Sequence, residues 1–228
     1  MRNLVRSVCC AAVLASPAAM AGVTGNASAV TEYLYRGIEQ SNGAAVQGGV
    51  DWTGATGFYA GTWVSTTGFT DANGAPVSYE TDFYGGYTFK VGDIGLDAGL
   101  LYYYYREQTD FNTLEAYIGA TFAMFTGKIY YTPEYFGAVD AAGDDLGGLY
   151  GTVSAAFPLS ETLTLTPQLG VNSGDGVDAI FGEEFIDYSV TLAKTLDAGM
   201  TFSFALVGTD IEGDDQKLVI GLKKAFDL

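Results

Sequence analysis

Apolar and small polar residues alternate along this chain in segments of about ten residues, and this alternation constrains the fold most strongly. In the stretch 162–171, Leu163, Leu165 and Leu169 fall on one face of an extended strand, and the threonines and Gln168 fall on the other. After residue 21 there is no apolar run of about 18 residues, so the pattern does not predict a membrane-spanning helix. Alternating segments separated by Gly, Asp, Asn or Pro are typical of a transmembrane β-barrel.

Twelve segments follow this pattern, at 25–36, 45–53, 57–66, 78–90, 93–106, 112–123, 125–135, 146–158, 161–171, 184–194, 198–208 and 216–227. The connections between them alternate in length, with short turns at 53–56, 91–93, 123–126, 159–161 and 196–199 and longer polar stretches elsewhere. Bacterial barrels have an even number of strands, short periplasmic turns and longer extracellular loops. The sequence therefore predicts an all-β fold, an antiparallel transmembrane β-barrel of about 12 strands with acidic extracellular loops.

The first 21 residues have the features of a secretory signal peptide. Arg2 and Arg6 precede an apolar stretch from Val8 to Leu14, and Ala19-Met20-Ala21 resembles a cleavage site. We expect residues 1–21 to be removed and residues 22–228 to form the barrel. Both cysteines of the chain lie in the removed part, so the mature protein is predicted to contain no disulfide.

Composition and charge exclude several classes of function. Without residues 1–21 the chain has eight basic and 27 acidic residues, a net charge of −19 instead of −17. Such an acidic protein is a poor nucleic-acid binder. The chain has no histidine, which removes Ser-His-Asp and Cys-His catalysis and His-ligated metals. We predict that it is not an enzyme, with no catalytic, cofactor-binding or metal-binding residues.

Charged side chains within the segments fall mainly on the face away from lipid. A charge facing lipid at the membrane midplane costs about 2–4 kcal/mol for Arg or Lys. Alternation therefore predicts ten residues that line the lumen: Glu32, Arg36, Asp51, Asp82, Asp97, Glu115, Lys128, Asp187, Lys217 and Lys223. Glu32 and Arg36 are four residues apart on one predicted strand face. They form either a charge filter at a pore constriction or a structural ion pair of a small barrel.

Four consecutive tyrosines end the fifth segment, and alternation sends them to opposite faces. We predict that Tyr102 and Tyr104 anchor at the lipid headgroups, while Tyr103 and Tyr105 line or narrow the outer mouth. The same reasoning predicts an outer aromatic girdle that also contains Tyr33, Tyr35, Trp63, Tyr79, Tyr131 and Tyr135.

One stretch of about 40 residues, 28–65, resembles a known family. Its features are Tyr33-x-Tyr35-Arg36-Gly37, the Gln40-Ser41 turn, the run 47–51 (QGGVD) and the run 57–61 (GFYAG). These are similar to the opening of the TorF-type porin family, proteobacterial outer-membrane proteins catalogued as conserved hypothetical proteins. The resemblance implies a barrel in the cell outer membrane with channel activity.

The hypothesis from the sequence is a porin-like channel for passive diffusion of small solutes or ions, whose acidic mouth favours cations. The alternative is a plugged structural or adhesive barrel that acts through acidic loops at 140–148, 172–178 and 210–215. These loops lack a complete calcium-binding pattern and favour a solvated anionic rim. Expected partners are outer-membrane lipid and lipopolysaccharide, the barrel assembly machinery and small solutes or ions, but not nucleic acid.

Overall fold

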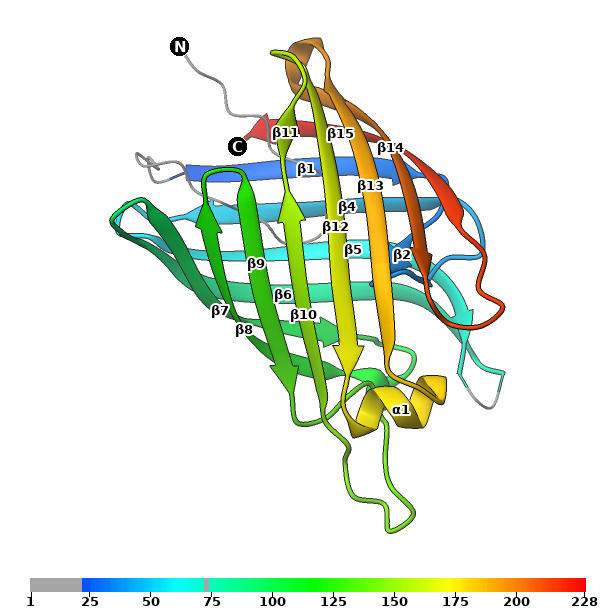
Figure 1. Cartoon of the computed structure of the whole chain (residues 1–228). Helices are drawn as coiled ribbons and strands as arrows, with labels where there is room; N and C mark the ends of the chain where they lie inside the picture. The colour runs from blue at the N-terminus through cyan, green and yellow to red at the C-terminus, as the bar shows by residue number, and fades with distance from the viewer. Residues whose placement is uncertain (1–21, 72–73) are drawn as a thin grey trace.

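Twelve antiparallel strands close into one barrel in the computed structural model of the chain, which describes residues 22–71 and 74–228 (Figure 1). The barrel strands are β1 (Gly22–Val30), β4 (Ala45–Thr53), β5 (Phe58–Thr70), β6 (Pro76–Val91), β7 (Ile94–Tyr104), β8 (Thr113–Phe122), β9 (Phe125–Thr132), β10 (Gly148–Ala155), β12 (Leu163–Ser173), β13 (Phe185–Thr195), β14 (Met200–Thr209) and β15 (Lys217–Asp227). The predicted fold class and the number of strands are confirmed. The predicted signal peptide, residues 1–21, lies outside the described residues.

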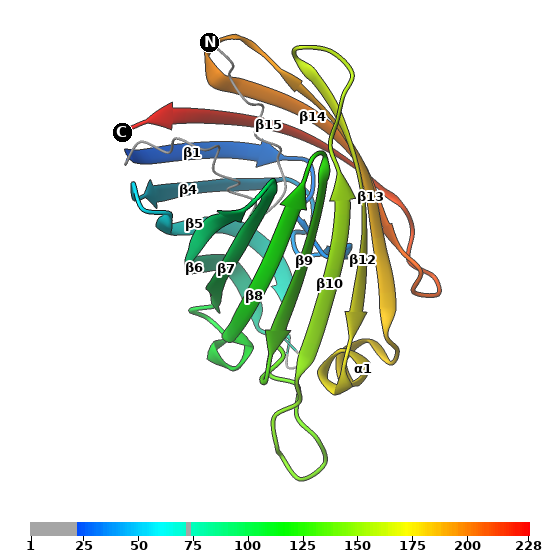
Figure 2. The same cartoon turned by 60° about the vertical axis from the view of Figure 1, so that its left-hand side comes forward.

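The sheet closes without a free edge. β1 pairs with both β4 and β15, and β10 pairs with both β9 and β12. A two-residue strand, β11 (Phe157–Pro158), continues β10 and pairs with the start of β12. Figures 1 and 2 show β9, β10 and β12 on one wall, crossing β1, β4 and β5 on the other wall at a steep angle. Closure satisfies the strand hydrogen bonds that an open sheet would leave unpaired in lipid.

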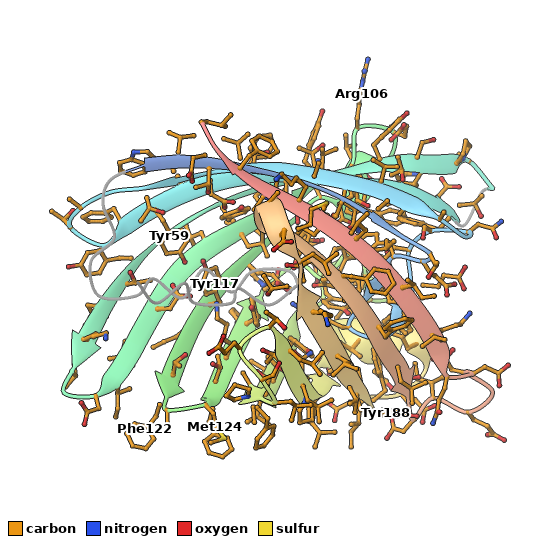
Figure 3. All side chains as sticks on the ribbon, turned by 90° about the horizontal axis from the view of Figure 1, so that it is seen from above. Tyr59, Arg106, Tyr117, Phe122, Met124 and Tyr188 are labelled. Atoms are coloured by element: carbon orange, nitrogen blue, oxygen red, sulfur yellow. The ribbon has the colours of Figure 1, made fainter. Side chains whose placement is uncertain are left out.

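The outer surface of the barrel is apolar. Leu100, Ile118 and Ile129 are each more than half exposed, although they lie in the middle of their strands. In Figure 3, Phe122 and Met124 point away from the barrel, whereas Tyr59 and Tyr117 lie within it. A soluble protein rarely exposes so continuous an apolar surface, so this belt is the surface that contacts lipid.

Inside the barrel, tyrosine rings lie over glycines of the neighbouring strand. Tyr59 on β5 is paired in register with Gly86 on β6, and Tyr117 on β8 is paired with Gly99 on β7. A Cβ atom at Gly99 would lie 2.7 Å from the Tyr117 ring, so no larger residue fits at Gly99 without displacing the ring. Glycine therefore leaves the space in which an inward tyrosine packs flat against the barrel wall.

The first predicted strand, 25–36, is wrong in its second half. β1 ends at Val30, and the chain then forms a small hairpin from β2 (Leu34–Tyr35) and β3 (Ile38–Glu39). Arg36 (φ 49°) and Gly37 (φ 85°) turn this hairpin with positive φ at both positions, as in a type I′ turn. The turn chemistry of Arg36-Gly37 overrides the strand-like alternation of Tyr33 and Tyr35. We call residues 31–44 the inner hairpin.

A short helix, α1 (Asp175–Phe181), lies in the polar connection between the predicted strands 161–171 and 184–194. It ends at Gly182, which has a left-handed conformation. Val177 packs with Tyr135 and Phe185 in a small apolar cluster. Across residues 22–71 and 74–228, no helix is long and apolar enough to cross a membrane.

Candidate functional site in the barrel lumen

The strand register shows which predicted lumen residues point into the barrel, because residues paired across antiparallel strands share a face. Eight of the ten lie on inward strand faces: Asp51, Asp82, Asp97, Glu115, Lys128, Asp187, Lys217 and Lys223. The other two, Glu32 and Arg36, lie in the inner hairpin. Their shared role in lining a pore remains a prediction.

Glu32 and Arg36 do not pair with each other along one strand face, which corrects the sequence interpretation. The strand that was expected to carry both residues ends at Val30. Beyond Val30, a spacing of four residues therefore no longer places two side chains on the same strand face. Glu32 lies 3.6 Å from Lys217, whereas Arg36 pairs with Glu115 on β8. The hairpin thus carries Arg36 across the interior toward β8, while Glu32 stays near the start of β15.

Arg36 is held in the lumen by one carboxylate and several rings. Its Nη2 atom donates to both carboxylate oxygens of Glu115 at 2.7 Å, and Tyr103 also donates to Glu115 at 3.0 Å. The guanidinium lies 4.1 Å from the ring centre of Tyr150 and 4.7 Å from that of Tyr35. The Arg36 and Glu115 side chains are only 7% and 2% exposed, so this is a desolvated ion pair with cation–π support.

The base of the inner hairpin is fastened by a weaker, more exposed cluster. Lys217 Nζ lies 3.0 Å from Glu39 and 3.6 Å from Glu32. Burial and the neighbouring Glu39 carboxylate raise the pKa of Glu32, against the opposing effect of Lys217. Because these side chains are partly exposed, each of these ion pairs contributes only about 0–1 kcal/mol.

Tyrosine hydroxyls support the other lumen carboxylates. Glu80 accepts hydrogen bonds from Tyr33 at 2.7 Å and from Tyr105 at 2.6 Å. Asp97 accepts one from Tyr59 at 2.7 Å and pairs with Lys128 at 2.8 Å.

On the other side of the barrel, Asp187 accepts hydrogen bonds from Tyr150 and Asn172 at 3.2 and 3.0 Å. Asp51 accepts one from Tyr84. Neutral hydroxyl and amide donors stabilise these carboxylates without cancelling their negative charge.

Asp82 is the exception to this pattern. Its side chain faces inward between Trp63 on β5 and Tyr103 on β7, which are its partners in register, and Glu80 lies two residues away on β6. The residue is 6% exposed, and its Oδ1 atom is buried with no hydrogen-bond partner in the described part of the chain. A buried carboxylate oxygen without a donor is energetically unfavourable.

The wall formed by β12–β15 has a different character. Apart from Asp187, Lys217 and Lys223, which also face inward here, many of its inward residues are small and polar: Thr164, Thr166, Gln168, Ser189, Thr191, Thr201 and Ser203. The tyrosines cluster on the wall formed by β5–β10 instead. The lumen is therefore asymmetric, with an aromatic and acidic wall opposite a small polar one.

Several aromatic residues predicted for the outer girdle lie inside the barrel. Tyr33 and Tyr135 are each 4% exposed, and Tyr35 packs on Tyr103 and Phe136. Trp63 faces inward and contacts Tyr33, with ring centres 5.4 Å apart. The inner hairpin draws Tyr33 and Tyr35 into the lumen, so position at a strand end did not predict their environment. Tyr79 and Tyr131 are 55% exposed, as a lipid-facing position requires.

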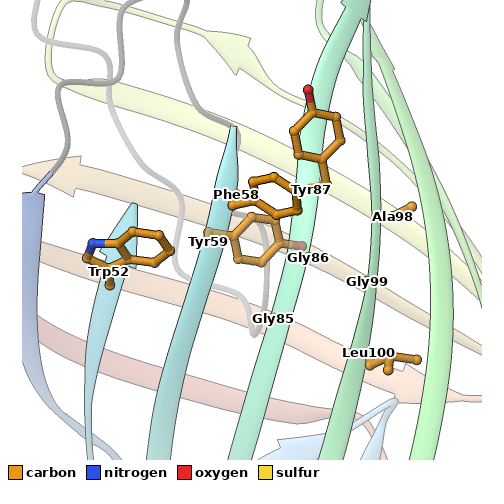
Figure 4. Close-up of a pocket in the computed structure, with 9 residues that line it drawn as sticks. All are labelled: Trp52, Phe58, Tyr59, Gly85, Gly86, Tyr87, Ala98, Gly99 and Leu100. Carbon is orange, nitrogen blue, oxygen red and sulfur yellow. The ribbon is translucent and has the colours of Figure 1, made fainter. Parts of the chain in front are cut away.

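A shallow hollow on the barrel wall is apolar and outside the lumen. It is rimmed by Trp52, Phe58, Tyr87 and Leu100, all exposed on the lipid-facing surface, above glycines of β6 and β7 (Figure 4). With no charged group in its lining, this hollow suits lipid chains and does not compete with the lumen as a functional site.

A family comparison covers almost the whole barrel. The profile of the family described as "Bacterial protein of unknown function (Gcw_chp)" matches residues 14–225. The chain belongs to the Gcw_chp family. No curated protein matches it. The resemblance to TorF-type proteins is not decided by the Gcw_chp match and stays a prediction.

Solved structures show the fold independently of sequence. The KdgM porin has 12% identity and a TM-score of 0.58, over 89% of this chain and 99% of that one. The NanC porin has 12% identity and a TM-score of 0.56, over 92% and 100%. An outer membrane channel from Pseudomonas putida F1 has 11% identity and a TM-score of 0.51, over 94% and 97%. The Gcw_chp chain therefore has the fold of outer-membrane porins.

Sequence reasoning missed several lumen residues. Glu80 was not among the predicted residues, although it lies two residues before Asp82 on β6 and therefore on the same inward face. The Gly–Tyr pairs across strands also carried a signal, because a glycine inside a strand often marks a place where another group approaches the backbone closely. Tyr35 had no signal of its own, since its position depends on the turn at Arg36 and Gly37.

Proposed function

We propose that this Gcw_chp protein is a porin-like channel of the outer membrane for passive diffusion of small solutes or ions, with a preference for cations. The supporting observation is the charge balance of the lumen. Within the described residues, Glu80, Asp82 and Asp187 take part in no ion pair, whereas Arg36, Lys128 and Lys217 are each paired with a carboxylate. Lys223 faces inward without a carboxylate partner in the described part of the chain, so the unpaired inward carboxylates named here outnumber it. Unpaired carboxylates raise the local concentration of cations in a low-dielectric passage.

Passage of small solutes is further supported by the structural neighbours. One similar solved structure is a KdgM porin in complex with disordered oligogalacturonate, with 12% identity and a TM-score of 0.56 over 89% of this chain and 99% of that one. Oligogalacturonate is an anion, however, and the acidic lumen of the Gcw_chp protein favours the opposite charge. We therefore propose the class of activity from the shared fold and the charge preference from this chain's own residues.

A plugged structural or adhesive barrel is the second candidate, and one observation favours it. The tip of the inner hairpin is packed among aromatic rings and fixed by a desolvated ion pair. Such packing would suit a closed plug as well as a constriction. On either reading the porin fold supports a non-enzymatic role, and contact with lipopolysaccharide and the assembly machinery remains a prediction, as does the TorF-type assignment.

Planar-bilayer recordings of the purified protein in a salt gradient test this proposal. We expect steady openings whose reversal potential indicates cation preference. In Asp187→Asn, which removes a lumen charge without releasing Arg36, the cation-to-anion permeability ratio should fall about twofold to fivefold, as expected for one unit charge near the ion path in water. Asp197→Asn, on an exposed turn after β13, is the matched control and should leave the ratio unchanged.

A silent bilayer would contradict the channel if the protein is correctly folded. Folding is checked by heat-modifiable migration on gels, which reports the barrel independently of conduction. Folded but silent protein would favour the plugged barrel. An open channel that is selective for anions would refute the charge argument alone.

A further inference from the structure

The environment of Asp82 has the composition of a binding site for a positively charged group. We define the Asp82 niche as Tyr33, Trp63, Glu80, Asp82 and Tyr103. Trp63 and Tyr103 flank Asp82 in register on the neighbouring strands, so all three side chains project from the same inward face. Tyr33 of the inner hairpin closes over them, with its ring 5.4 Å from that of Trp63 and its hydroxyl bonded to Glu80.

We propose that the Asp82 niche binds an organic ammonium group, such as that of a primary amine, as a selective station in the lumen. The proposal deepens the proposed channel function by naming a substrate class. It does not depend on conduction, because an ammonium group can bind in a barrel that is open only at its outer mouth.

The first argument is the unsatisfied carboxylate. Every other lumen carboxylate described above accepts a hydrogen bond or forms an ion pair, whereas Asp82 Oδ1 is buried and has no partner among residues 22–71 and 74–228. Glu80 and Glu115 add negative charge nearby, and Arg36 is engaged by Glu115. A donor supplied by a ligand would therefore satisfy an acceptor that the described chain leaves empty.

The second argument concerns the type of cation. Metal ions such as calcium need several oxygen ligands at once. Among residues 22–71 and 74–228, no three acidic residues are placed to hold a metal ion together. An ammonium group needs fewer carboxylates, because its N–H groups donate to one of them while aromatic faces cover its remaining surface. Trp63, Tyr33 and Tyr103 supply those rings beside Asp82.

Tryptophan fluorescence measures binding without conduction. The chain has two tryptophans, and Trp52 lies on the lipid-facing surface, so Trp52→Phe leaves Trp63 as the only reporter in the niche. The detergent-solubilised variant is titrated with ethylammonium chloride and, in parallel, with KCl at equal ionic strength. We expect a saturable change in Trp63 fluorescence with ethylammonium but not with K⁺.

Substitutions then locate the site. Asp82→Asn in the Trp52→Phe background should raise the ethylammonium concentration for half-saturation about tenfold or more, because the charge-assisted hydrogen bond is lost. Asp197→Asn is the matched control, since it removes a carboxylate on the exposed turn after β13, and it should leave half-saturation within about twofold. Because asparagine has nearly the size of aspartate, the barrel should still fold, which heat-modifiable migration checks.

Three results would overturn the ammonium site. They are an equal response to K⁺, a response that does not saturate, and the same half-saturation in Asp82→Asn as in its parent. The comparison with K⁺ needs no substitution at Asp82, so it tests the ammonium site even if Asp82→Asn fails to fold. Saturable binding together with a silent bilayer would refute the channel but keep the niche, which separates the two proposals.

Discussion

Replacement of Arg36 by methionine should release the inner hairpin from the lumen. Methionine keeps most of the length and apolar volume of the side chain but removes the guanidinium that bonds both oxygens of Glu115. Glu115 then stays buried, and Tyr103 is its one remaining side-chain donor in the described part of the chain. The hairpin should therefore spend more time detached from the aromatic wall.

The size of the effect follows from burial. Removing one partner of a buried ion pair costs about 3–5 kcal/mol. If that loss falls on the docked hairpin, the detached population rises on the order of a hundredfold to several-thousandfold, because each 1.4 kcal/mol is a factor of ten. Lys217→Met removes only the partly exposed pairs at the base, worth about 0–1 kcal/mol, and should raise the detached population no more than about fivefold.

Limited proteolysis measures this population. Chymotrypsin cleaves after aromatic residues, and the docked hairpin shields Tyr33 and Tyr35 within the lumen. When opening is fast relative to cleavage, the cutting rate follows the detached population. Cleavage between β1 and β4 in intact barrels should be much faster in Arg36→Met than in the wild type.

The double variant Arg36→Met/Glu115→Gln makes the test sharper. It removes the buried charge along with its partner, so cleavage should be slower than in Arg36→Met alone. Equal cleavage rates for Arg36→Met and Lys217→Met would refute the reasoning, because they would show that burial does not set the strength of the anchor. Unchanged cleavage in Arg36→Met would mean that the rings alone hold the hairpin.

Two further predictions concern the barrel wall and a loop. Gly86→Ala should lower the free energy of unfolding by about 1–3 kcal/mol, measured by thermal unfolding, because the added Cβ would meet Tyr59 Oη and lie 2.6 Å from a backbone oxygen. Gly151→Ala is the control and should be neutral, because an added Cβ there has no neighbouring atom within 4 Å. Backbone N–H groups of Asp144 and Ala142 lower the pKa of Asp140. The ionised Asp140 carboxylate therefore stabilises its loop fully at pH values above 3.8, the ordinary pKa of aspartate. This stabilisation is lost as the pH falls through the lower pKa that Asp140 has in the folded protein. The Asp144 amide chemical shift should titrate with that lower midpoint and stop doing so in Asp140→Ala.

The sequence predicted the barrel well because lipid and lumen impose a period of two on every strand. The segment predicted at 45–53 coincides with β4, and most others agree within about two residues. The inward direction of Asp82, Asp97 and Glu115 followed from the same alternation. The alternation of side chains between the two faces of a strand is a local property, so it can be predicted without knowing which strands are neighbours.

Contacts between distant segments could not be predicted in this way. The pairing of Arg36 with Glu115 spans 79 residues and depends on the inward path of the hairpin. The alternation of Tyr33 and Tyr35 continues that of β1, and only Arg36-Gly37 marked a turn. The sequence also could not predict that Asp82 Oδ1 lacks a donor among the described residues, because that depends on which donors from other strands bond to the neighbouring carboxylates instead.

The four consecutive tyrosines show how this lumen stays acidic and still folds. Tyr103 and Tyr105 point inward and donate to Glu115 and Glu80, on either side of Asp82. A lysine at either position would also stabilise the carboxylate, but it would cancel its charge and its field on a passing ion. A phenolic hydroxyl offsets part of the cost of burying the carboxylate and leaves the negative charge in place. The tyrosine-rich wall therefore supplies donors for buried carboxylates without adding positive charge, which is what the proposed preference for cations needs.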